Sequence, residues 1–333
     1  MDSDCKHDIL DAPVAPASPT PQPRKDGIPL THFQPKQSTF SKRFSNNPLY
    51  ISGDSYSGMI VPMVTYEIAK GLHAWQPVTD LHNDENSRVQ YFYRVGLIST
   101  ELYESKRSCQ GNIFHQYSSP QCFNDIAQIA MCTIKVNDAQ ILEPKCSFAS
   151  PKPQGLHWGR KFFDDLPIDI AFASSKREEN WCRNSDYVLS YIWANDQSVQ
   201  RALYVRNGTI IDWKRCNKTL DYDSDILSTV YYHRTLMAMG YRALIYSGDH
   251  DMMIPYTGTL SWIKTLNLST IDGWRPWFVE GQIAGFTMKL SEAATIGDGL
   301  VFATVKGGGH TAPEYKPKEC FQMVDRWLSY YFL

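Results

Sequence analysis

The stretch NNPLYISGDSYSGMIVPMV, residues 46–64, carries the local pattern that decides the fold. A short apolar run at Leu49–Ile51 leads into the glycine-flanked sequence GDSYSG, residues 53–58, and a second apolar run follows. In the second run, apolar residues recur at a spacing of four, as on one face of a helix: Ile60, Val64, Ile68 and Leu72. The pattern predicts a short buried strand, a tight turn and a helix, which is the basic unit of α/β proteins.

Two apolar runs near the C-terminus have the same strand-then-loop character. Residues 242–246 are followed by SGDHD, residues 247–251, and residues 300–305 lead to GGGH, residues 307–310. Both runs are short, apolar and bounded by glycine, so each predicts a strand that ends in a polar loop.

The elements around these strands are also readable. A helix is expected over 226–239 and another over 197–203, with a cap from Asn195 or Asp196. A hairpin is expected between 277–279 and 283–289. The closing helix over 317–331 places its apolar residues on one face: Phe321, Val324, Trp327 and Leu328.

Three predicted strands therefore end in loops that carry a serine, an aspartate and a histidine, in this order. Strand ends at one sheet edge are where α/β enzymes place their active sites, and the order is that of the α/β-hydrolases. Ser55 is expected to be the nucleophile and His310 its base, with Asp251 orienting the imidazole. The backbone N–H of Tyr56 is the expected oxyanion donor.

Each partner of the serine has a neighbouring rival. His250 is a second candidate base, although its loop would have to fold back toward Ser55. Asp249 is a second candidate for the orienting acid, and spacing alone does not choose between it and Asp251.

Composition excludes several classes of function. The net charge of −2 is spread over scattered residues, which gives no footprint for nucleic acid. No apolar run reaches the roughly 20 residues needed to span a bilayer. Neither H-E-x-x-H nor C-x-x-C occurs, so no metal site and no cofactor is expected.

The cysteines and the glycosylation sequons favour an oxidising compartment. Most cysteines fall in one middle region: Cys109, Cys122, Cys132, Cys146, Cys182 and Cys216. Three N-x-[ST] sequons begin at Asn207, Asn217 and Asn267. Clustered cysteines together with sequons favour disulfides and secretion, whereas the first residues do not resemble a signal peptide.

Six motifs occur between about Thr39 and the C-terminus: NPLYISGDSYSGMIVP, YIWANDQSVQRAL, ALIYSGDHDMMIP, GWRPW (residues 273–277), QIAGF and ATVKGGGHTAPEYKP. Together they make the chain resemble the serine carboxypeptidase-like family, particularly its plant branch. The resemblance implies an α/β-hydrolase fold with a cysteine-containing cap and a triad of Ser55, Asp251 and His310. It further implies the bridges Cys109–Cys122 and Cys146–Cys182, and a secreted or vacuolar location.

The residue before the serine separates two chemistries within this family. Peptidase members tend to carry a glutamate there, which binds the C-terminal carboxylate of a peptide. Asp54 instead looks like the members that transfer acyl groups from sugar esters to alcohols, so acyl transfer is the expected reaction. Carboxypeptidase activity on a peptide is the alternative reaction. In a third interpretation Asp54 has no role in substrate choice and only stabilises the turn.

The sequence departs from the family in two places. The resemblance implies early strands with a GGPG loop, which bears a second oxyanion donor, and a further core strand before Val78; neither is found. The resemblance also implies a disulfide between Cys216 and a cysteine that precedes the serine motif. The one cysteine in that region is Cys5. We expect a Pro-rich disordered lead over 1–35 and a partial hydrolase domain over 36–333, with its cap at 99–221. An inactive family member is therefore a second alternative.

Overall fold

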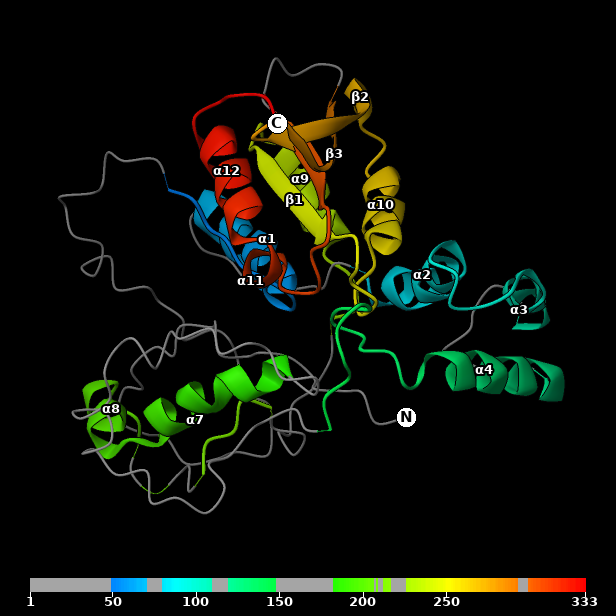
Figure 1. Cartoon of the computed structure of the whole chain (residues 1–333). Coiled ribbons are helices and arrows are strands. Elements are labelled where there is room, and N and C mark those ends of the chain that lie inside the picture. Colours follow the sequence, from blue (N-terminus) through cyan, green and yellow to red (C-terminus); the bar gives the residue numbers. More distant parts are fainter. Residues whose placement is uncertain are drawn as a thin grey trace, which may run out of the picture.

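The structure is a computed structural model of the 333-residue chain (Figure 1). It describes residues 49–70, 80–109, 119–147, 182–206, 208, 212–216, 226–292 and 299–333. The expected lead over 1–35 lies outside the described residues.

A mixed four-stranded sheet forms the centre of the described chain. Its strands are β1 (Ala243–Gly248), β2 (Ser269–Val279), β3 (Gln282–Ser291) and β4 (Leu300–Val305), in the order β1-β4-β3-β2. β1 and β4 are parallel, whereas β2–β3 and β3–β4 are antiparallel. The strands predicted over 242–246 and 300–305 and the predicted hairpin are confirmed.

The hairpin turn follows from two residues that adopt positive φ. Glu280 (φ 48°) and Gly281 (φ 74°) connect Val279 to its register partner Gln282. Two residues with positive φ are typical of the type I′ turn, whose twist matches that of antiparallel strands.

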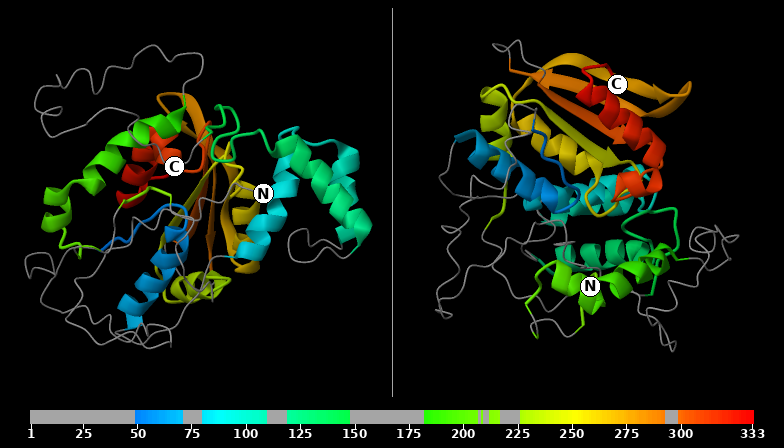
Figure 2. Two further views of the ribbon diagram at one scale, coloured as in Figure 1. Left: turned by 90° about the horizontal axis from the view of Figure 1, so that it is seen from below. Right: turned by 90° about the vertical axis from the view of Figure 1, so that its left-hand side faces the viewer.

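Helices cover both faces of the sheet (Figure 2). α9 (Val230–Ala238) and α10 (Tyr256–Thr265) pack on one face, where Leu300 and Phe302 of β4 point. α11 (Ala312–Tyr315) and α12 (Pro317–Leu328) pack on the other, against Ala303 and Val305. β4 is thus buried on both faces, as expected for a central strand with alternating side-chain directions.

α1 (Ser57–Lys70) packs beside α9, where the rings of Tyr66 and Tyr232 meet edge to face at 4.9 Å. The predicted strand at Leu49–Ile51 is wrong, because these residues are extended coil and Leu49 is 55% exposed. A strand requires a partner for its backbone groups, and none of the described strands pairs with this segment. Tyr50 packs its ring against Trp327 instead, at 5.7 Å.

Both predicted helices are present, but each buries other residues more deeply than those of its predicted apolar face. α1 buries Pro62 and Tyr66 and leaves Val64 and Ile68 exposed. α12 buries Cys320 and Met323 and exposes part of the predicted face: Phe321, Val324 and Leu328. Both helices carry apolar residues on more than one side, so periodicity alone does not select the side that meets the sheet.

The remaining helices lie away from the sheet. α2 (Leu81–Arg94), α3 (Thr100–Ser105), η4 (Lys106–Cys109) and α4 (Pro120–Thr133) share an apolar cluster that includes Val89, Tyr91 and Ile129. η5 (Arg183–Tyr187), α7 (Val188–Asn195) and α8 (Gln197–Ala202) follow. The Asp196 cap is confirmed, since its carboxylate accepts from the N–H groups of Ser198 and Val199.

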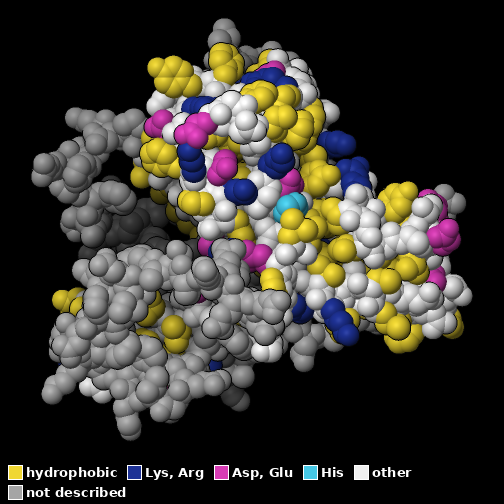
Figure 3. Space-filling view, in the orientation of Figure 1, with side chains coloured by type: hydrophobic (Ala, Val, Ile, Leu, Met, Phe, Trp, Pro, Cys, Tyr) yellow, Lys and Arg dark blue, Asp and Glu magenta, His cyan; other side chains and the backbone are white. Residues whose placement is uncertain are grey.

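Both implied disulfides, Cys109–Cys122 and Cys146–Cys182, are confirmed. The helices in the described parts of 99–221 lie off the sheet (Figure 1), and the extent of a cap there stays a prediction. On the face shown in Figure 3, basic and acidic side chains are interspersed. In the part of the chain that the structure describes, no helix has the length and apolarity needed to cross a bilayer.

Candidate active site

Ser55 stands on a sharp turn immediately before α1. Its φ is 54°, in the left-handed region that a serine rarely adopts. The turn is held by two backbone hydrogen bonds, from Ser57 N–H to the Asp54 carbonyl (3.0 Å) and from Gly58 N–H to the Ser55 carbonyl (2.9 Å). A strained turn of this kind raises a side chain clear of the helix that follows, as in a nucleophile elbow.

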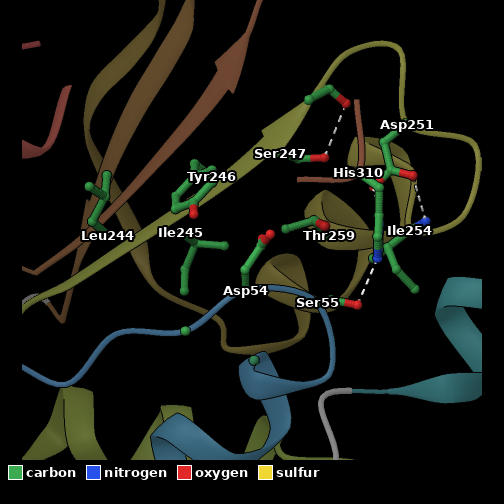
Figure 4. A pocket seen from close by; sticks show the side chains of 13 residues that line it. Asp54, Ser55, Leu244, Ile245, Tyr246, Ser247, Asp251, Ile254, Thr259 and His310 are labelled. Carbon is green, nitrogen blue, oxygen red and sulfur yellow. Dashed lines mark hydrogen bonds and ion pairs between the residues drawn. The ribbon is translucent and has the colours of Figure 1, made fainter. Parts of the chain in front are cut away.

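The structure brings Ser55, His310 and Asp251 together (Figure 4). The Ser55 Oγ lies 2.7 Å from Nε2 of His310, and Nδ1 of the same ring lies 3.0 Å from Asp251 Oδ2. The side chains of His310 and Asp251 are only 10% and 5% exposed. Both ring nitrogens are thus occupied, one by the hydroxyl and the other by a buried carboxylate.

The Asp251 carboxylate is fixed by its own loop. Its second oxygen, Oδ1, accepts hydrogen bonds from the backbone N–H groups of Met253 (2.7 Å) and Ile254 (3.1 Å). Two such donors hold the carboxylate in place and leave Oδ2 directed at the imidazole.

The two rival residues serve other contacts. Asp249 Oδ1 accepts from the Gly307 N–H at 2.7 Å, so this carboxylate braces the β1 loop against the β4 loop. Nε2 of His250 lies 3.9 Å from Asp249 Oδ1, and its buried Nδ1 has no hydrogen-bond partner among the described residues. His310 and Asp251, and neither rival, form the hydrogen-bonded chain to Ser55.

A segment that sequence reasoning missed immobilises both loops. The Ala139 carbonyl accepts from the His310 N–H (2.7 Å), and the Asp138 carbonyl accepts from the Met252 N–H (2.9 Å). Gln140 donates through Nε2 to the Gly307 carbonyl at 3.1 Å. These contacts use mostly backbone atoms, so no side-chain pattern in the sequence signals them.

An open pocket of ≈ 150 Å³ adjoins Ser55 and His310. One wall comes from β1, from Leu244 to Gly248, and Ile254 and Thr259 lie at its end near Asp251. Asp54 lines the same pocket, next to the Tyr246 phenol (Figure 4). Burial raises the pKa of Tyr246, and the negative charge of Asp54 raises it further. The pocket is mostly apolar with a few polar groups, as small-molecule sites usually are.

The other predicted residues are placed as follows. Tyr56 lies between Ser55 and the first residue of α1, and its role as oxyanion donor stays a prediction. Asn267 is exposed at the turn between α10 and β2, whereas Asn207 and Asn217 lie outside the described residues. Among the residues that the structure describes, no group of three His, Cys, Asp or Glu side chains could hold a metal.

Asp84 is a buried carboxyl close to this site that the sequence did not reveal. It stands in the first turn of α2 and packs under α10, where a Cβ on Gly258 would lie 3.0 Å from its Oδ1. That oxygen has no hydrogen-bond partner among the described residues. Burial raises the pKa of Asp84 to about 7, and the negative charges of Asp80, Asp251 and Glu85 add to the effect.

The raised pKa of Asp84 makes the free energy of unfolding depend on pH. The folded state prefers the neutral carboxyl, so this stabilisation is complete below pH ~4 and is lost as pH rises through about 7. Asp84→Asn cannot ionise, so we expect it to be more stable than the wild type at pH 8, by on the order of 3 kcal/mol. Urea unfolding at pH 4, 6 and 8 measures this, with Asp325→Asn on the exposed surface of α12 as control. Equal pH dependence in wild type and Asp84→Asn would contradict the expectation.

The close approach of the two loops at Gly248 gives a prediction about Ser55 reactivity. A Cβ there would lie 2.3 Å and 2.4 Å from the carbonyl oxygens of Gly309 and Gly308. Gly248→Ala must therefore separate Asp251 from His310, and we expect at least about a hundredfold loss in the rate at which a fluorophosphonate labels Ser55. Gly273→Ala, where a Cβ meets nothing within 4 Å, is the matched control. Wild-type labelling by Gly248→Ala would refute this account of the loops.

Comparisons with known proteins agree with this geometry. The family model for serine carboxypeptidase matches residues 30–330. Serine carboxypeptidase-like 8 from Arabidopsis thaliana is 39% identical over 318 residues, covering 91% of this chain and 66% of that protein. Serine carboxypeptidase-like 17 from the same plant is 38% identical over 316 residues, covering 90% of this chain and 64% of the relative. The chain therefore spans slightly less than two thirds of the length of these relatives.

A solved structure shows the same fold. The prohormone-processing carboxypeptidase Kex1(Δ)p from Saccharomyces cerevisiae matches with a TM-score of 0.50 and 14% identity, over 83% of this chain and 61% of that chain. The expected α/β-hydrolase fold is thereby confirmed. Family model and relatives together show that the chain belongs to the serine carboxypeptidase family.

Proposed function

We propose that this chain performs acyl transfer through a covalent acyl-serine at Ser55, taking the acyl group from a sugar ester and passing it to an alcohol. The observation that carries the proposal is the hydrogen-bonded chain from Ser55 through His310 to Asp251. A serine so placed is activated by its base, and the buried acid stabilises the imidazolium that forms.

The proposed reaction has two balanced steps. The Ser55 Oγ attacks the acyl carbon while His310 Nε2 takes the hydroxyl proton, and the same proton then passes to the departing sugar oxygen. An alcohol next gives its proton to His310 and attacks the acyl carbon. His310 passes that proton to Ser55 Oγ as the bond from this oxygen to the acyl carbon breaks, which releases the new ester and restores Ser55. The Tyr56 N–H is the proposed donor to the oxyanion in both steps.

Asp54 supports an ester donor over a peptide. It lies beside the reacting serine, in a pocket whose lining is mostly apolar. An aspartate is one methylene shorter than the glutamate of peptidase members, so it reaches less far into the pocket toward the terminal carboxylate of a peptide.

Two alternatives to acyl transfer are compatible with the same triad. Release of C-terminal amino acids uses the same acyl-serine, with water in place of the alcohol. An inactive family member is favoured by the oxyanion site, because we assign only one donor, Tyr56, among the described residues. One missing donor raises the barrier by about 3–4 kcal/mol.

We also place the protein in an oxidising compartment, secreted or vacuolar. Two disulfides, Cys109–Cys122 and Cys146–Cys182, support this, as does the exposed sequon at Asn267. Disulfides of this kind persist where thiols are not kept reduced.

The test of function has two arms. First, a fluorophosphonate probe should label the wild type and fail to label Ser55→Ala, since the hydroxyl is the only group changed. Absence of Ser55-dependent labelling would exclude the enzymatic proposal and favour the inactive alternative.

Second, the wild type is offered a sugar ester with an alcohol acceptor and, separately, an N-blocked peptide. We expect new ester formation, and we expect Asp54→Glu to lower transfer relative to hydrolysis. Release of a C-terminal amino acid without ester transfer would establish the peptidase alternative instead.

A further inference from the structure

Arg183 occupies a buried junction outside the catalytic pocket. It follows Cys182 at the start of η5, and its side chain is only 14% exposed. Nε donates to Glu143 Oε2 at 2.8 Å and Nη2 donates to Oε1 of the same carboxylate, which gives a bidentate pair. Nη1 points to a second carboxylate, Glu314 Oε1, at 3.4 Å, and the guanidinium lies 4.2 Å from the centre of the Tyr315 ring.

The two carboxylates belong to the two segments that meet at His310. Glu314 follows His310 in a tight turn, where its Oε2 accepts from Thr311 Oγ1 (2.7 Å) and its N–H donates to the Thr311 carbonyl (2.9 Å). Glu143 ends the segment that begins at Ala139, whose carbonyl accepts the His310 N–H. Arg183 therefore bridges both sides of the backbone contact that holds the imidazole.

These two segments are closely packed against each other at Gly309. A Cβ on Gly309 would lie 2.3 Å from the Ala139 carbonyl oxygen and 2.9 Å from the Tyr315 ring. Closely packed atoms transmit displacement instead of absorbing it. A shift of either segment must therefore move His310.

We propose that Arg183 is a positioning residue for His310, which locks the turn after the histidine to the segment that binds its backbone. The inference rests on the proposed function, in which His310 is the base. It also gives the residues after Cys182 a role at the catalytic centre, although none of them touches the reacting atoms.

Charge and covalent structure support this assignment. Without Arg183, Glu143 and Glu314 would face each other without a shared cation, and their repulsion would separate the two segments. The hydrogen bonds that Arg183 donates to Glu143 raise the pKa of Arg183, so the pair stays charged. The Cys146–Cys182 bridge ends next to Arg183 and close in sequence to Glu143, which keeps the partners near each other.

The conservative replacement is informative because lysine cannot reproduce these contacts. An ammonium group neither forms a bidentate pair in this geometry nor stacks flat on Tyr315, although it keeps the charge. Arg183→Lys should thus retain part of the function that Arg183→Met loses.

The experiment uses the full chain and the second-order rate of fluorophosphonate labelling at Ser55, measured from pH 5 to 9. We expect Arg183→Met to label about ten- to a hundredfold more slowly, with a shifted pH profile, and Arg183→Lys to fall between it and the wild type. Arg275→Met is the matched control. Arg275 also pairs with a carboxylate, that of Asp272, but it lies on β2, away from His310. The rate and profile of this variant should equal those of the wild type.

A second readout does not require labelling. Histidine ¹⁵N resonances, with His310 assigned by His310→Gln, should shift and broaden in Arg183→Met and stay unchanged in Arg275→Met. If the wild type is not labelled, the proposed function fails, and these resonances alone decide the role of Arg183.

Two outcomes would overturn the inference. In the first, Arg183→Met has the same labelling rate, pH profile and His310 resonances as the wild type. The other is an equal effect in Arg275→Met, which would indicate general destabilisation. If Arg183→Met does not fold, Glu314→Gln replaces it. This variant keeps the Arg183–Glu143 pair and removes the charge that holds Arg183 to the turn after His310, so a smaller loss in the same direction is expected without a change in melting temperature.

Discussion

The parallel pairing of β1 with β4 is the constraint on which the site depends. Because the two strands run in the same direction, their carboxyl ends reach the same sheet edge, and the loops bearing Asp251 and His310 leave side by side. The backbone then fixes the loops at close range, with the His250 N–H donating to the Gly308 carbonyl at 2.9 Å. The acid and the base are therefore neighbours before any side chain interacts. Ser55 needs only to be brought to a histidine that is already oriented.

The position of Ser55 depends on a different part of the structure, the turn before α1. Ser55 holds a positive φ on a turn of two short backbone hydrogen bonds, and α1 continues directly from it. Such a conformation costs about 1–3 kcal/mol and persists only where the surroundings enforce it. Here the enforcement comes from α1, anchored on α9 by the Tyr66–Tyr232 contact. The hydroxyl position is thus set by packing some distance along the helix, together with the hydrogen bond to His310 in the pocket.

How far the sequence predicts this structure depends on whether the determining interactions are local. The strands at β1 and β4, the hairpin and the Asp196 cap were predictable, because each depends on neighbouring residues. The strand at Leu49–Ile51 and the buried faces of α1 and α12 were not, because both depend on which partner a segment meets. The bracing by Asp138–Gln140 and the burial of Asp84 were equally invisible. They arise from segments more than a hundred residues apart and, in the first case, mostly from backbone atoms.

The choice between alcohol and water as final acceptor cannot reside in the triad, which acts identically in both reactions. It must come from the pocket that holds the second substrate, and the described pocket offers few polar groups beyond the triad. Asp54 stands beside the serine, and the Tyr246 phenol, whose pKa is raised, stays a neutral donor across the physiological range. A carboxylate next to a neutral hydroxyl can hold an alcohol by accepting its hydrogen bond, whereas a peptide carboxylate would be repelled by an ionised Asp54. Position 54 is therefore where the proposed acyl transfer and its peptidase alternative differ in what the pocket must bind.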